Sequence, residues 1–95
     1  MFVLSLRYIA PLEAVDTLLP AHREWLEQQR DAGHFFAWGR KVPRDGGMIL
    51  ARAASRAEAE RLASSDPFVT GGVAQTDVIE FDPAYLAPGL ELLGS

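Results

Sequence analysis

A chain of 95 residues that is 48% apolar can bury one hydrophobic core, so we expect one domain that spans residues 1–95. Its net charge of −4 and its scattered basic residues argue against non-specific nucleic-acid binding. The sequence holds no cysteine, which excludes disulfides and thiolate sites, and no apolar run approaches the ~20 residues of a membrane span.

Residues 2–9, "FVLSLRYI", alternate in side-chain direction and predict a strand. Both faces are fairly apolar, so the strand is expected to be central and covered on both sides. Residues 11–32 predict a helix that ends at Gly33, with a break or restart expected at Pro20. Its apolar face includes His22.

A hairpin is predicted next, from strands at 34–42 and 48–54 around a turn at 43–47 that contains Asp-Gly. A second helix follows to about residue 64, and Ser55 and Glu58 have the spacing of a capping box at its start. The last strand is expected at residues 73–81. It closes a core of about residues 2–82 and leaves an irregular C-terminal tail at 83–95.

The resulting order, β-α-β-β-α-β, predicts an α+β fold of the ferredoxin-like type. Two right-handed crossovers joined by a hairpin give a four-stranded antiparallel sheet with both helices on one face. The opposite face is then uncovered in a single chain. A second copy of the chain is the simplest cover, and a homodimer is therefore expected.

The segment "SSDPFVTGG" at 64–72 is longer than the about two to six residues that usually join a helix to a strand. Asp66 before Pro67 predicts an N-cap of a short helical turn, which glycine would end. The same loop could instead turn back and bring the carboxylate to His22. Both roles are compatible because a carboxylate has two oxygens.

Two stretches, "PAHREWLEQQRDAGHFFAWG" and "SRAEAERLASSDPFVTGGVAQTDVIEF", resemble the YCII-related (YciI-like) proteins. The matching positions are His22, Gly39 and the Asp66-Pro67-Phe68 turn with the glycines after it. This resemblance implies a dimeric ferredoxin-like α/β barrel with a His–Asp pair facing a pocket. It also implies enzymatic chemistry that is unassigned for most members. A few members are linked to breakdown of ring compounds, including elimination of chloride.

The sequence departs from the family after Gly39, where Arg40 stands in place of the proline that many members carry. An arginine there could alter the rim of the pocket and the charge of the substrate that it prefers. The resemblance therefore does not carry a substrate over to this chain.

Histidine titrates near neutrality and can take up and return a proton, so His22 is the predicted general acid/base and Asp66 its orienting partner. The competing interpretation is a core histidine beside a capping aspartate. Candidate substrate-binding side chains are Tyr8, Trp38, Arg40 and Phe68. For the aromatic residues the alternative is a core role, and for Arg40 it is a solvated position at the end of a strand.

The leading hypothesis is a small dimeric enzyme of the lyase or isomerase type that needs no metal and no organic cofactor. Its two histidines are twelve positions apart, which is a weak basis for a metal site. The alternative is a non-catalytic dimeric domain that binds a ligand. The expected partners are a second copy of the chain and a small organic molecule, and not nucleic acid or a membrane. The expected location is the cytoplasm.

Overall fold

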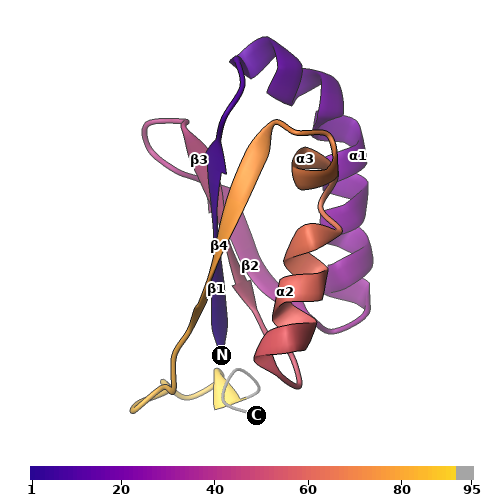
Figure 1. The fold of residues 1–95 in the computed structure, drawn as a ribbon. Coiled ribbons are helices and arrows are strands. Elements are labelled where there is room, and N and C mark those ends of the chain that lie inside the picture. Colours follow the sequence, from indigo (N-terminus) through magenta and orange to yellow (C-terminus); the bar gives the residue numbers. More distant parts are fainter. Residues whose placement is uncertain (92–95) are drawn as a thin grey trace.

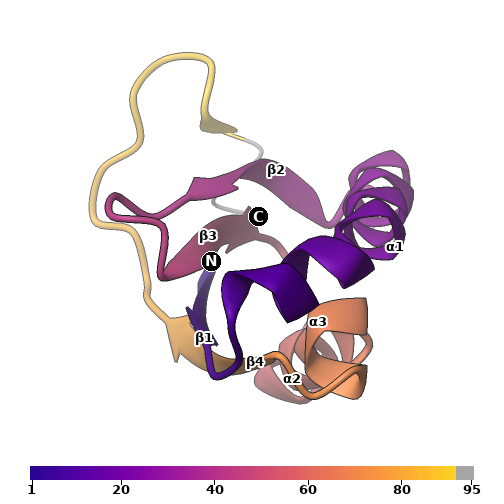
Figure 2. The same ribbon diagram turned by 90° about the horizontal axis from the view of Figure 1, so that it is seen from above.

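The structure, a computed structural model, describes residues 1–91. It confirms the predicted fold class: an antiparallel four-stranded sheet in the order β2-β3-β1-β4, with the helices on one face (Figures 1 and 2). The elements are β1 (Phe2–Tyr8), α1 (Leu12–Asp31), β2 (Phe35–Arg40), β3 (Gly46–Ala51), α2 (Arg56–Ser64), α3 (Pro67–Thr70) and β4 (Ala74–Glu80). None of the helices in this range combines the length and hydropathy that crossing a membrane requires.

Strand β1 is central, as its pattern predicts, because it pairs with β3 on one side and with β4 on the other. Phe2, Leu4 and Leu6 project toward the helices and are buried. Residues 1–91 leave the opposite face of β1 without a covering layer: Val3 is only partly buried and Arg7 is exposed. Cover for this face is expected from a second copy of the chain, as predicted from the sequence.

Helix α1 runs without interruption through Pro20, so the predicted break is wrong. Proline removes one backbone donor, which leaves the carbonyl of Asp16 without its usual partner inside the helix. Both Pro20 and Asp16 are exposed, so water can hydrate that carbonyl. Packing of the buried residues on either side of Pro20, among them Val15 and Trp25, holds the two halves in one helix.

Strand β3 begins at Gly46, earlier than the sequence predicts, so both glycines of the expected turn belong to the sheet. Gly46 lies opposite Arg7 of β1, and Gly47 lies opposite Leu6. A Cβ atom placed on Gly46 would lie 1.9 Å from the carbonyl oxygen of Leu6. The glycine therefore permits a close approach of β3 to β1, and the turn is confined to residues 41–45.

Helix α2 begins with the predicted cap by Ser55, while the return bond of the expected capping box goes to the residue before the N-cap. Oγ of Ser55 accepts a hydrogen bond from the backbone N–H of Glu58 at 3.1 Å. The Glu58 carboxylate in turn accepts from the backbone N–H of Ala54 at 3.4 Å. The first bond satisfies a backbone donor in the first turn of α2 that has no partner inside the helix, and the second satisfies the donor of the residue before the N-cap.

Replacing Ser55 by alanine is expected to lower the free energy of unfolding by about 0.5–2 kcal/mol, because the N-cap bond is lost. Ser64→Ala is the matched control in the same helix, since the Ser64 hydroxyl only donates to the Glu60 carbonyl at an exposed position. Denaturant unfolding of both variants measures the difference. Equal midpoints would show that the cap contributes nothing to stability.

Candidate active site

The loop between α2 and β4 presents Asp66 as the N-cap of α3. Oδ1 of Asp66 accepts a hydrogen bond from the backbone N–H of Phe68 at 2.9 Å, and Pro67 occupies the first turn. The turn ends at Gly71, and Gly72 has a φ of 76°, a conformation that glycine adopts without strain. The chain thereby reverses into β4 with the Asp66 carboxylate facing inward, toward α1.

The same carboxylate oxygen binds the imidazole of His22, at 2.7 Å from Nδ1. Both side chains are buried, with residue exposures of 8% for His22 and 1% for Asp66. A carboxylate only accepts hydrogen bonds, so Nδ1 carries the hydrogen and donates it. In the neutral ring the other nitrogen, Nε2, is consequently an acceptor and can take up a proton.

The imidazole is held in place by neighbouring rings. The ring of Phe68 stacks on it with 3.8 Å between centroids and 6° between planes, and the Trp25 ring lies 5.7 Å away. The indole N–H of Trp25 donates to Oγ of Ser65 at 2.9 Å. This bond ties α1 to the residue before Asp66, so the two halves of the pair are fixed relative to each other.

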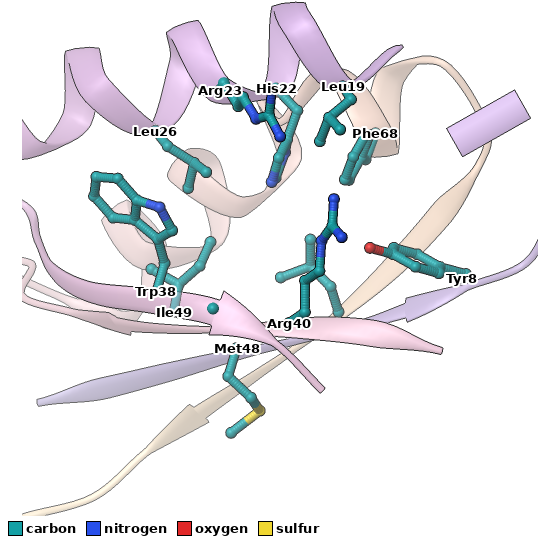
Figure 3. Close-up of a pocket in the computed structure, with 13 residues that line it drawn as sticks. Tyr8, Leu19, His22, Arg23, Leu26, Trp38, Arg40, Met48, Ile49 and Phe68 are labelled. Atoms are coloured by element: carbon teal, nitrogen blue, oxygen red, sulfur yellow. The ribbon is translucent and has the colours of Figure 1, made fainter. Parts of the chain in front are cut away.

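A cavity of about 170 Å³ lies between α1, α3 and the sheet (Figure 3). The His22 ring points into it from α1, and in the described part of the chain no hydrogen bond to Nε2 is present. The walls are mainly apolar. The lining side chains are Leu6, Tyr8, Leu19, His22, Arg23, Leu26, Trp38, Arg40, Ile49 and Phe68; Met48 also borders the cavity, but its side chain points to the opposite face of the sheet (Figure 3).

All four predicted substrate-binding side chains line this cavity. Tyr8, Trp38 and Arg40 project from the sheet, and the Arg40 guanidinium extends into the space between sheet and helix (Figure 3). Phe68 is 2% exposed and combines both interpretations, since it belongs to the core and also forms part of the cavity wall. Trp38 is 38% exposed and is therefore not a core residue.

Sequence reasoning missed Arg23, which the helical pattern assigns mostly to the exposed side of the helix. The structure places it on the cavity wall beside His22. An arginine directly after the histidine lies at the boundary of the apolar face, and its long stem can reach either side. Only its position next to His22 in the sequence indicates that Arg23 could reach the site.

No group of three or more His, Asp or Glu side chains that could hold a metal ion occurs among residues 1–91. The groups at the site that could ligate a metal are one imidazole and one carboxylate, and these already bind each other. Their arrangement suits movement of a proton at Nε2.

The arrangement of helices and strands has a counterpart in 5-chloro-2-hydroxyhydroquinone dehydrochlorinase from Burkholderia phenoliruptrix, solved in complex with 2,5-dihydroxybenzoquinone. The TM-score is 0.71, and the match covers 85% of this chain and 93% of that chain at 22% sequence identity, which shows a common fold. No curated protein sequence matches this chain. The model of the YCII-related domain matches residues 1–82, and the chain therefore belongs to the YCII-related family.

Proposed function

We propose that this protein catalyses proton transfer on a small organic molecule without a cofactor, as a lyase or an isomerase. The observation that carries the proposal is the His22 ring, whose Nδ1 is bound to Asp66 while its Nε2 side faces a cavity. A histidine with one nitrogen fixed by a carboxylate and the other open to a ligand has the arrangement of a general acid/base.

In the proposed reaction Nε2 removes a proton from a carbon or hydroxyl of the substrate. The electron pair left behind forms a new double bond. In an elimination, a leaving group such as chloride departs with its own electron pair. In an isomerisation, His22 returns the proton at a second position. In both cases the Asp66 carboxylate stabilises the imidazolium that forms, and Phe68 keeps the ring from rotating.

The elimination route has support from the dehydrochlorinase that shares the fold. That enzyme's name describes loss of chloride from a chlorinated ring, and its structure holds a quinone. A planar ring also fits a cavity bounded by the aromatic side chains of Trp38 and Phe68.

The test is a two-stage screen. Small cyclic compounds are first selected by thermal shift, since a ligand that binds only the folded state raises the melting temperature. Compounds that bind are then incubated with the protein in D₂O, and NMR detects deuterium incorporation or product. A proton-transfer enzyme is expected to act on at least one of them, with turnover reduced about 10²–10⁴-fold in His22→Gln.

The alternative function is a non-catalytic domain that holds a metabolite. The same cavity supports it, because ligand binding does not require His22 to exchange protons. Ligands that bind tightly but show neither product nor deuterium exchange would favour this alternative. Turnover that is unchanged in His22→Gln would also contradict the proposed role of the histidine.

We further propose that the protein is a homodimer joined through the sheet face that the helices leave open. Met48, Ile79 and Phe81 are 42%, 49% and 41% exposed, although they are apolar. Burying them against a second copy removes apolar surface from water. Light scattering is expected to give twice the chain mass of 10.4 kDa, and Ile79→Lys to shift the protein toward the monomer. A wild-type mass of one chain would contradict this prediction.

A further inference from the structure

The wall of the cavity carries positive charge, although the protein as a whole is acidic. The formal net charge of the chain is −4. The residues that line the cavity include two arginines, Arg23 and Arg40, and no aspartate or glutamate. Asp66 lies behind the imidazole of His22 and is 1% exposed, so it does not form part of the wall.

A third arginine nearby is already neutralised. Arg44, in the loop before β3, forms an ion pair with Asp16 of α1. The pKa of Asp16 is lowered, mainly by its hydrogen bond with Arg44, against a smaller effect of burial, and then by the charges of Arg44, Arg40 and Arg23. Arg44 is thus the arginine that binds this carboxylate.

Arg23 and Arg40 keep their donors available for a ligand. Within the described residues neither forms an ion pair or a side-chain hydrogen bond, whereas Arg30, Arg44 and Arg56 each have an acidic partner. The planar guanidinium group matches the geometry of a carboxylate and can bind it through two parallel hydrogen bonds. The cavity therefore offers two unused carboxylate binders on opposite walls, one on α1 and one on β2.

The remaining wall fits a single ring. The cavity of about 170 Å³ is close to the ~150 Å³ of an engineered apolar cavity that accommodates benzene. Phe68 and Trp38 contribute aromatic surface, and Leu26 and Ile49 contribute aliphatic surface. A ring held against these side chains also lies within the space that the His22 ring faces.

We propose that the cavity selects a six-membered-ring carboxylic acid, with its carboxylate bound by Arg23 and Arg40 and its ring against Phe68 and Trp38. This inference rests on the proposed function and assigns a substrate class to the same site. Fixing the carboxylate at the arginines orients the ring, so that one particular ring position is presented to Nε2 of His22.

Benzoate and its neutral isostere benzamide are the probes, and isothermal titration at fixed pH and ionic strength measures both. Wild type is expected to bind benzoate at least about tenfold more tightly than benzamide. Arg40→Met and Arg23→Met keep an apolar stem and remove the charge, and each is expected to weaken benzoate binding about tenfold or more without affecting benzamide. Both arginines are exposed, so the fold should tolerate these changes, and circular dichroism checks it.

Arg30→Met is the matched control. Arg30 lies on the same helix as Arg23, is 53% exposed and pairs with Asp31 away from the cavity. Arg30→Met changes the net charge by the same amount as the other two variants. Because Arg30 lies away from the cavity, the benzoate affinity of this variant should stay close to that of wild type. If Arg30→Met weakens benzoate binding as much as the other two variants, the preference comes from the net charge of the protein, and the proposed subsite is wrong.

The inference also fails if wild type does not prefer benzoate to benzamide, or if neither probe binds. Its outcome is separable from that of the proposed function, because binding is measured without turnover. A benzoate preference in a protein that turns over no compound leaves the subsite intact and contradicts the catalytic proposal. If the protein turns over neutral rings in a reaction that depends on His22 but does not prefer benzoate, the catalytic proposal is supported and the carboxylate subsite is contradicted.

Discussion

Replacing Asp66 by alanine is expected to lower the free energy of unfolding by about 2–5 kcal/mol. One oxygen of this carboxylate receives both the cap hydrogen bond from Phe68 and the bond from the His22 imidazole. Alanine removes the cap and leaves a buried imidazole N–H without a partner. Since small domains are stable by only about 5–15 kcal/mol, the variant is expected to be partly unfolded under mild denaturing conditions.

Asp66→Asn separates the structural role of this residue from its catalytic role. The asparagine oxygen can accept both hydrogen bonds, but its NH₂ group replaces the buried Oδ2, which has no hydrogen-bond partner, so Asp66→Asn should lose some stability but clearly less than Asp66→Ala. A neutral amide does not stabilise an imidazolium as a carboxylate does, so turnover on any substrate identified for the wild type should fall. If Asp66→Asn and Asp66→Ala lose equal stability, the hydrogen bonds to Oδ1 do not hold the loop. If Asp66→Asn retains full turnover, the charge of Asp66 has no part in catalysis.

Gly46→Ala is the second change expected to have a large effect. The added methyl group would lie 1.9 Å from the Leu6 carbonyl oxygen and 2.9 Å from its carbon, both of which are backbone atoms of a central strand. Neither atom can move without disturbing the pairing of β1 with β3. The expected loss is about 1–3 kcal/mol or more, measured by denaturant unfolding.

Gly39→Ala provides the control in the neighbouring strand β2. A Cβ atom at Gly39 meets nothing within 4 Å, and the residue does not have a positive φ. Its replacement should therefore leave the free energy of unfolding unchanged or raise it by about 0.4–1 kcal/mol, because alanine lowers the conformational entropy of the unfolded chain. Equal destabilisation at both positions would show that loss of glycine itself, rather than the contact with Leu6, is responsible.

The fold could be predicted from the sequence because its local signals agree with one another. The alternation of residues 2–9 and the N-cap signal at Ser55 each predict an element that the structure contains. The errors concern positions where tertiary contacts override local preference. Pro20 is held inside a helix by packing on both sides, and Gly46 serves the approach of two strands rather than a turn.

The contact between His22 and Asp66 was predictable only in part. The helical pattern places the histidine on the apolar face, and the Asp-Pro pair predicts the cap. The long-range approach of residues 44 positions apart came from the resemblance to a family. Nothing local indicates that Arg23 and Arg40, on a helix and a strand, face one cavity, because that depends on how α1 crosses the sheet.

The shared oxygen of Asp66 also makes the Phe68 amide a reporter of the histidine. Its N–H and the imidazole N–H donate to the same atom, so a fluctuation that swings the carboxylate away frees both at once. Hydrogen exchange at the Phe68 amide therefore reports those openings of the His22–Asp66 pair in which the carboxylate moves. A bound ligand that keeps the imidazole in place should slow this exchange, which makes the pair observable in solution before any reaction is known.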